Sequence, residues 1–441
     1  MTGMTLMHLV PVLLLLSFCA ILAAGEPLPP GRDAYAKIAK EVEASFERDI
    51  VGAWFPRSID PAGGFHDSFD RQWNRLPSGG KFLVFQARMT WVSAQIAMRR
   101  PERREEFIGY VRHGLRCLND TLWDKEHGGF YAGLEPSGKT GQFGPEKHVY
   151  GIAFGMYAAA AAYEATHDRE ALDLAMRTFR WLEEHAHDKK HGGYHEILTR
   201  EGNVVPMPDP VTPANARYAG GGFYYGFKSM NSHIHLLEAL AELNRVHADP
   251  LVKARTAEML GIVRDKIAGP PGCLSLFFTP DWRPVPDHDS FGHDIETAFL
   301  LIEAAESLGQ PDDPATLRMS RMLVDHTLNW GFDPKGGLNE AGLALGAPTD
   351  TKKIWWTQVE AMNALLLMHE RFGGETDRYW KAFQRQWEFI RVNLIDPEHP
   401  GLFSEANPKT MNKANRWKAA YHDGRSLMRV SERLRKLASE P

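Results

Sequence analysis

Three histidines of this 441-residue chain stand where a buried helix is expected to begin. His293 lies in S-F-G-H-D-I-E, His233 in M-N-S-H-I-H-L-L, and His422 in W-K-A-A-Y-H-D-G-R. Imidazole exchanges protons near neutral pH, and the positive end of a helix dipole disfavours its charged form. We therefore expect neutral histidines that can accept a proton. One histidine at a helix start is more often structural than catalytic, but three at equivalent places indicate a shared role.

Other polar and aromatic residues occupy the same kind of position. Arg88 is expected in the first turn of the helix that contains Q-A-R-M-T-W, and Glu296 lies one turn after His293. Glu296 can orient the ring of His293, or it can complement the helix dipole as Asp294 does, with Ser290 as the N-cap. The candidates for substrate contact are His148, Tyr150, Trp355, Trp356 and Trp417. Trp417 serves equally well as core filler.

A metal site is the main alternative use of such histidines. It requires histidines at i and i+4, or a cluster of carboxylates and cysteines, and neither is apparent in the sequence. His233 and His235 are two residues apart and point to different sides of a helix, so one of them faces away from the cluster. Cys117 and Cys273, the cysteines outside the N-terminal apolar segment, are expected to be buried thiols. We therefore expect no metal and no other cofactor.

The elements that must position these residues repeat along the chain. A motif of an aspartate, a Gly-Gly pair and an apolar residue recurs about every 64 residues, with one longer interval of about 80. The longer interval contains a Pro/Gly-rich insertion at 201–226. The copies are D-P-A-G-G-F at Asp60, D-K-E-H-G-G-F at Asp124, D-K-K-H-G-G-Y at Asp188, a degenerate G-P-P-G-C-L at Gly269, D-P-K-G-G-L at Asp333 and D-P-E-H-P-G-L at Asp396.

Each copy follows an amphipathic helix and precedes a more apolar one. The apolar helices are predicted at 86–98, 149–163, 233–243, 295–308, 357–368 and 427–437. Six helix pairs without polar caps at either end favour a closed ring over an open solenoid. The predicted fold class is all-α, an (α/α)6 barrel or toroid of six hairpins. Its inner helices would all start at one end, which brings the candidate residues to one cleft.

Composition limits the class of protein and its partners. The chain is 43% hydrophobic and 24% charged, with a net charge of −5 and no long basic run, so nucleic acid is not an expected partner. The apolar run from Leu6 to Ala24 is typical of a signal peptide, predicted to cover 1–25 and to precede a single barrel domain at 33–441. Secretion or export to a periplasm is expected. A cytoplasmic location, through an incorrect start codon, and an uncleaved anchor remain the alternatives. No later segment is apolar enough to span a bilayer, and the oligomeric state stays open.

The chain resembles the N-acylglucosamine 2-epimerase superfamily, and within it the cellobiose and mannobiose 2-epimerase branch. The stretches that carry the resemblance are K-S-M-N-S-H-I-H-L-L-E-A-L, S-F-G-H-D-I-E, K-K-I-W-W-T-Q-V-E-A and W-K-A-A-Y-H-D-G-R. The likeness runs from about residue 35 to about residue 437. The resemblance implies an (α/α)6 barrel and reversible inversion at C2 of a reducing-end sugar, without a cofactor. The apparent signal segment, the insertion and the degenerate fourth repeat depart from the family pattern.

The resemblance also implies roles for the candidate residues. His293 and His422 would be the acid/base pair that serves opposite faces of C2 through a cis-enediolate. His233 and Arg88 would bind the O1/O2 region, and Glu296 would hold His293. Stacking platforms would come from Trp355, Trp356 and Trp417.

Other functions remain open at this point. N-acylglucosamine epimerisation and aldose–ketose isomerisation of a free hexose are the nearest alternatives. A non-catalytic sugar-binding barrel or a glycoside hydrolase-like protein is a further one, because many such barrels cleave glycosides with paired carboxylates. Histidines rather than carboxylates at the predicted cleft argue against hydrolysis.

Overall fold

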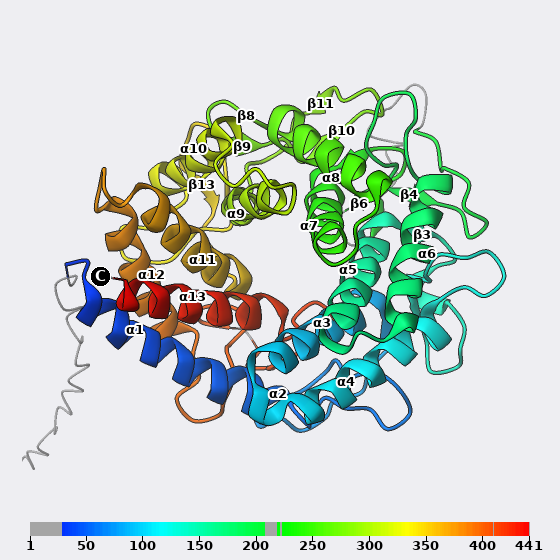
Figure 1. The fold of residues 1–441 in the computed structure, drawn as a ribbon, viewed down its shortest axis with the longest axis horizontal. Coiled ribbons are helices and arrows are strands. Elements are labelled where there is room, and N and C mark those ends of the chain that lie inside the picture. Colours follow the sequence, from blue (N-terminus) through cyan, green and yellow to red (C-terminus); the bar gives the residue numbers. More distant parts are fainter. Residues whose placement is uncertain (1–28, 208–217, 221–222, 409, 441) are drawn as a thin grey trace, which may run out of the picture.

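Two concentric rings of helices make up the protein. The computed structural model describes residues 29–207, 218–220, 223–408 and 410–440, which leaves the predicted signal peptide and part of the insertion outside the described residues. The inner ring consists of α3 (Leu83–Arg99), α5 (Val149–Thr166), α7 (Met230–Val246), α9 (Phe291–Ser307), α11 (Trp355–Phe372) and α13 (Tyr421–Ser439) (Figure 1). The outer ring consists of α1 (Arg32–Ser45), α4 (Arg104–Arg116), α6 (Arg169–His185), α8 (Pro250–Ile262), α10 (Pro314–Trp330) and α12 (Arg378–Asn393). The predicted (α/α)6 barrel is confirmed.

The inner ring closes on itself. Each inner helix packs against the next one along the chain, and α13 packs against α3. Each outer helix covers the inner helix that precedes it in the chain, so α4 covers α3, whereas α1 covers α13. The inner helices are buried almost all round, as the run Ala158–Ala162 of α5 illustrates, whereas the outer helices bury one stripe. This difference in burial is what the apolar and amphipathic patterns predicted.

Short strands link the helices at the end where the inner helices begin. They pair two or three residues at a time, always antiparallel. Their bounds are β1 Lys81–Phe82, β2 Gly133–Leu134, β3 Lys147–His148, β4 Ile197–Leu198, β5 Tyr218–Gly220, β6 Phe223–Tyr224, β7 Lys228–Ser229, β8 Ala268–Gly269, β9 Cys273–Leu274, β10 Phe277–Phe278, β11 Pro284–Val285, β12 Ala341–Gly342 and β13 Pro348–Asp350. A short helix, α2 (Gly52–Trp54), follows α1.

A lysine fastens the repeat motif in five of the six units. In the second unit, the amide of Asp124 donates to the carbonyl of Gly129 across the turn at 2.9 Å, and Lys147 Nζ donates to the Asp124 carboxylate at 3.1 Å. Lys147 stands two residues before α5, so the ion pair ties the turn to the start of the inner helix. We call this pair the lysine latch. The other latches are Asp60–Lys81, Asp188–Lys228, Asp333–Lys353 and Asp396–Lys413.

Most inner helices begin earlier than the sequence predicted. Helix α3 starts at Leu83, so Arg88 lies in its second turn and not in the first. The start of α3 follows the pairing of the strand before it, β1 with β2, and α3 has no capping side chain, whereas Ser229 caps α7 through the amide of Ser232. Ser290, the expected N-cap of α9, makes no capping hydrogen bond. The prediction relied on local capping signals, and tertiary pairing determined the boundary instead.

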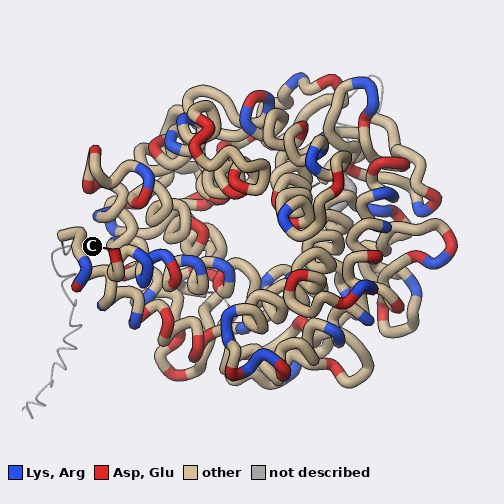
Figure 2. Tube along the Cα trace, in the orientation of Figure 1, with Lys and Arg blue, Asp and Glu red and all other residues tan. Residues whose placement is uncertain are grey.

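Charge is spread evenly over the protein. Basic and acidic residues alternate around both rings (Figure 2), in keeping with a net charge of −5. Within the described residues, no helix is both long and apolar enough to cross a membrane.

Candidate active site

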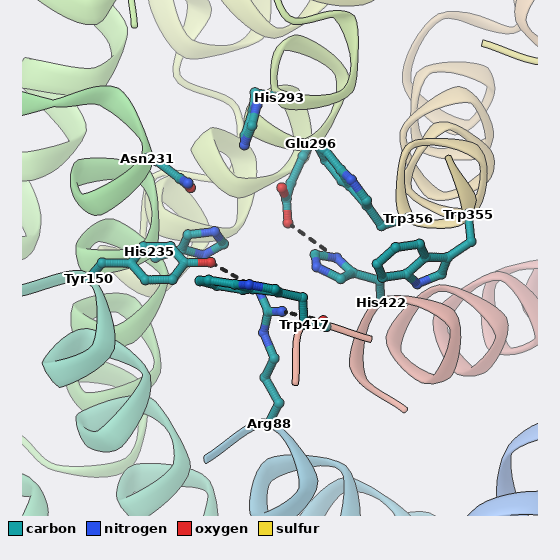
Figure 3. A pocket seen from close by; sticks show the side chains of 10 residues that line it. All are labelled: Arg88, Tyr150, Asn231, His235, His293, Glu296, Trp355, Trp356, Trp417 and His422. Atoms are coloured by element: carbon teal, nitrogen blue, oxygen red, sulfur yellow. Dashed lines mark hydrogen bonds and ion pairs between the residues drawn. The ribbon is translucent and has the colours of Figure 1, made fainter. Parts of the chain in front are cut away.

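A cavity of about 450 Å³ opens where the inner helices begin. It is lined by Arg88, Tyr150, Asn231, His235, His293, Glu296, Trp355, Trp356, Trp417 and His422 (Figure 3). Eight of the ten residues predicted for the site are in this group. His233 and His148 are the two that are not, whereas Asn231 and His235 were not predicted.

Two positions of the repeat supply most of the lining. The second residue of an inner helix contributes Tyr150, Asn231, Trp356 or His422, and the sixth contributes Arg88, His235 or Glu296. Residues four apart lie on one face of a helix, one turn above the other. The repeat therefore places two layers of side chains around the barrel axis. His293 is an exception, because it is the third residue of its helix.

His422 is held by a buried carboxylate. Its Nδ1 lies 2.7 Å from Oε1 of Glu360 and 3.9 Å from Oε1 of Glu296. Because Nδ1–H donates a hydrogen bond to the carboxylate, Nε2 is left with a lone pair, as a proton acceptor requires. Burial lowers the pKa of His422 well below its usual range, and the nearby Arg88 guanidinium adds to this effect. His422 is therefore neutral at pH 7.

One arginine unites three glutamates beneath the cavity. Arg425, on α13, is fully buried and makes ion pairs with Glu238, Glu296 and Glu360. A buried charge of this kind is tolerated only when it is paired and hydrogen-bonded. Arg425 thus fixes the carboxylates that contact the site histidines, and we refer to these four residues as the arginine hub.

His293 and His422 both lie beside the ring of Trp356. The Trp356 ring centroid lies 4.8 Å from that of His293 and 5.5 Å from that of His422. Nδ1 of His293 lies 2.7 Å from the hydroxyl of Ser290, a group that can both donate and accept. Enclosure by the cavity walls lowers the pKa of His293 to about 4, although Glu296 opposes the shift. Because Ser290 suits either tautomer, Nε2 can take up a proton and release it again.

Arg88 approaches the cavity from α3. Its guanidinium donates to the hydroxyl of Tyr150 at 3.1 Å and to the carbonyl of Trp417 at 3.2 Å. It also lies 4.6 Å from the ring centroid of Phe154. Nε of Arg88 and Oδ1 of Asn231 are buried and have no partner among the described residues. These two atoms are free to bind the hydroxyl or oxyanion groups of a ligand.

His235 rather than His233 belongs to the cavity. Nδ1 of His235 lies 3.0 Å from Oε2 of Glu238, a member of the arginine hub. Glu238 is buried, yet the Arg425 guanidinium and His235 hold its pKa far below the usual range. His235 is therefore oriented by an ionised carboxylate, in the same way as His422.

His233 has a structural role, so its predicted place in the site is wrong. Both ring nitrogens are used, since Nδ1 contacts the carbonyl of Ser229 at 2.6 Å and Nε2 accepts from the amide of Tyr194 at 3.0 Å. Burial lowers the pKa of His233 to about 3. His233 is the fourth residue of its helix, and at that position Gln86 and Gln358 bind the backbone of the motif turn in other units.

Two further expectations need correction. His148 lies beside the barrel rim, where its ring centroid is 6.2 Å from that of Phe223, and it does not line the cavity. Glu296 does not orient His293, because Arg425 engages its carboxylate and the hydroxyl of Ser290 binds the histidine instead. The carboxylate of Glu296 lies near His422 instead.

The carboxylates near His422 are poorly suited to a metal ion. Glu296, Glu360 and His422 are close enough to share one. The guanidinium of Arg425 already contacts both carboxylates, and it supplies the positive charge that a metal would bring.

The sequence profile of the N-acylglucosamine 2-epimerase family matches residues 63–424. The chain belongs to this family. It is 31% identical to the cellobiose 2-epimerase of Bacteroides fragilis over 405 residues, which cover 89% of this chain and 98% of that one. A D-mannose isomerase of Thermobifida fusca is 24% identical over 76% of this chain and 81% of its own length.

Solved structures of family members have the same fold. The cellobiose 2-epimerase of Spirochaeta thermophila superposes with a TM-score of 0.80 at 32% identity, covering 92% of this chain and 98% of that one. The family membership makes this chain an isomerase of the sugar epimerase type.

Proposed function

We propose that the protein interconverts gluco- and manno-configured reducing-end sugars by inverting C2, with a cellobiose-type disaccharide as substrate. The observation that carries this proposal is that two histidines, His293 and His422, line one cavity and both lie beside the ring of Trp356. Inversion needs a proton acceptor on one face of a carbon and a proton donor on the other. The similarity to cellobiose 2-epimerases supports this choice of reaction and substrate.

The reaction begins with the open-chain sugar, because C2–H is acidic only beside a C1 carbonyl. One histidine removes this proton through Nε2, and the electron pair forms the C1–C2 double bond of a cis-enediolate with negative charge on O1. The second histidine takes up a proton from water and returns it to the opposite face of C2, and the first histidine then releases its proton to water. The same two groups exchange roles in the reverse direction, so each is required in both.

The developing charge on O1 needs hydrogen-bond donors at the cavity wall. Arg88 is placed to supply one, whereas Nε2 of His235 and Oδ1 of Asn231 can accept from sugar hydroxyls. The arginine hub carries three glutamates against one arginine, so the surroundings of His422 are rich in negative charge. Glu296 thereby partly offsets the effect of burial and of Arg88 on His422, so that the imidazolium formed on proton removal is less costly than it would be without this carboxylate.

Three indoles at the cavity favour a disaccharide over a free hexose. Trp355, Trp356 and Trp417 all line it. Aromatic faces stack on the apolar faces of sugar rings, and Trp356 alone is enough for the reacting ring between the two histidines. We assign Trp417 and Trp355 to the second ring. Isomerisation of a free hexose, the activity named for the D-mannose isomerase relative, is the second candidate and would return the proton to C1 instead of C2.

Proton NMR in heavy water tests the proposal. The enzyme is incubated with cellobiose, mannose, glucose or N-acetylglucosamine, and the exchange of C2–H and the appearance of each epimer or ketose are followed. We expect deuterium at C2 together with formation of the manno epimer of cellobiose. A ketose from mannose, with cellobiose inert, would establish the isomerase instead.

Two variants test the roles of the histidines. His293→Asn and His422→Asn should each lower kcat in both directions by roughly 10² to 10⁴, the worth of a positioned acid or base. One variant should still exchange C2–H of one epimer without inverting it, since one face still works. If both variants epimerise at the wild-type rate, the two-histidine mechanism is wrong.

A further inference from the structure

The fourth repeat unit lacks the lysine latch. Gly269 stands at the place of the motif aspartate, and Cys273 stands at the place of the second glycine. Asp289, two residues before α9, stands where the first, second, third and fifth units have their lysine. The fourth unit therefore presents a carboxylate at a place where its neighbours present an ammonium group.

These replacements converge with a histidine from the outer ring. Oδ2 of Asp289 lies 2.6 Å from Nε2 of His326 on α10. The side chains of both are at most 1% exposed. One ligand-type atom from each of Cys273, Asp289 and His326 lies within 4.8 Å of the others. Cys273 is half-buried rather than buried as expected from the sequence, so the cluster can be reached from the side of its thiol.

A second carboxylate adjoins the cluster. Asp294 is the fourth residue of α9 and accepts from the amide of Leu274 through Oδ1 at 2.9 Å, as Gln358 does for Leu338 in the fifth unit. Its Oδ2 and Oδ1 of Asp289 are buried and have no hydrogen-bond partner among the described residues. Two buried carboxylates in this arrangement call for a shared proton or a cation.

We propose that Cys273, Asp289 and His326, with Asp294 as the fourth group, bind one Zn²⁺ ion. Thiolate, imidazole and carboxylate are the ligands that zinc prefers, and the thiolate argues against Mg²⁺ or Ca²⁺. Binding replaces the Asp289–His326 hydrogen bond by two bonds to the metal. The thiol proton is released, and the proton of that hydrogen bond is released or moves to Nδ1 of His326. The ion restores the positive charge that a lysine supplies in the other units.

The proposed ion has a structural role. It ties the motif turn of the fourth unit to α10 and to the start of α9, as each lysine latch ties its own turn. The ligands come from three separate segments of the chain, which is why no zinc spacing is visible in the sequence. The proposal does not depend on the reaction at the cavity, because none of the four residues lines it.

Cobalt titration of the purified, metal-free protein tests the site. Co²⁺ reports a thiolate ligand through a charge-transfer band in the near ultraviolet and a tetrahedral site through intense visible bands. We expect one equivalent of Co²⁺ to give both, and Zn²⁺ to displace it. Cys273→Ser should abolish the charge-transfer band, and His326→Gln should weaken binding by roughly tenfold or more. Cys117→Ser, a change of the other described cysteine, should leave the spectrum unchanged.

A variant that rebuilds the lysine latch is a control for variants that lose Co²⁺ binding only because they fail to fold. In Gly269→Asp/Asp289→Lys the fourth unit regains the pair found in its neighbours, and a Cβ at Gly269 would meet nothing within 4 Å. We expect this variant to fold and to bind no Co²⁺, and its Tm should not respond to a chelator, whereas chelation should lower the Tm of the zinc-loaded wild type. The proposal is overturned if the wild type gives no thiolate band, or if the double variant or Cys273→Ser gives the same band.

Discussion

Replacing His233 by glutamine separates a structural histidine from a catalytic one. His233 accepts from the amide of Tyr194 and contacts the carbonyl of Ser229. At the same helix position in the fifth unit, Gln358 accepts from the amide of the motif residue Leu338 at 2.7 Å and donates to the carbonyl of that residue at 2.8 Å. Glutamine should therefore fit at position 233 and leave kcat and KM unchanged. His233→Ala leaves a buried amide and carbonyl unpaired, at a cost of roughly 1–3 kcal/mol each in the free energy of unfolding.

The same variant should reduce the sensitivity of the protein to acid. The folded state holds the pKa of His233 at about 3, against an ordinary value of 6.5. Below pH 6.5 the unfolded state binds a proton that the folded state does not, so stability is lost as pH falls from 6.5 toward 3. At pH 4.5 the loss from this residue is about 2.7 kcal/mol, two pH units at about 1.36 kcal/mol each. Glutamine does not titrate, so this loss should disappear.

Thermal unfolding at pH 7 and pH 4.5, together with kcat at pH 7, checks both expectations. The difference in Tm between the two pH values should be smaller for His233→Gln than for the wild type. His235→Gln is the matched variant, because His235 lies on the same helix and lines the cavity. It should lower kcat while keeping the acid sensitivity of the wild type. A loss of kcat by roughly 10² or more in His233→Gln at unchanged Tm would refute our assignment and make His233 a catalytic residue.

Three further results are expected. Because the pKa of His293 is about 4, kcat/KM should be flat on the acid side of neutrality down to about pH 5 and should fall with a midpoint near pH 4, measured in initial rates on cellobiose. Glu360→Gln should lower kcat by roughly 10 to 10², the worth of a charge-assisted hydrogen bond to His422, and should leave KM nearly unchanged; an equal rise in KM would indicate a binding role. We also propose that the apolar N-terminal segment directs export, so N-terminal sequencing of protein from a native host should show cleavage near residues 23–25, and an intact Met1 in a soluble cytosolic fraction would contradict this.

The fold was predictable because the motif repeats. Six copies at nearly constant spacing define six equivalent units, and the apolar helix in each must be the inner one. The ends of those helices were less predictable. The start of α3 depends on the pairing of β1 with β2, two segments about 50 residues apart, and local capping signals do not report such pairing.

The error at His233 arose because the starts of the inner helices were predicted too late in the sequence. With α7 assumed to begin at residue 233, His233 occupied the first turn and faced the cleft, whereas the helix begins at Met230. A comparison between repeats would have revealed His235, since Arg88, His235, Glu296 and Glu360 all occupy the sixth position of their helices.

The arginine hub could not be predicted from spacing. Arg425 and its glutamate partners lie on four different inner helices, and each alone is an ordinary charged residue in an otherwise apolar stretch. Charged residues on helices that are buried all round must be paired, which is the one signal that the sequence carried. Which residues pair depends on how the ring closes.

Because the ring closes, the first helix of the chain, α1, supports the last one, α13, which carries residues of the site. Helix α1 covers α13, which carries His422 and Arg425, and Tyr35 of α1 meets His369 of α11 at 2.8 Å (Figure 1). The first and last helices of the described chain are thus packed against each other. A truncation that removes α1 would expose the back of α13 and disorder residues almost 400 positions away in sequence. Fusion partners and purification tags should therefore be placed so that α1 stays packed against α13.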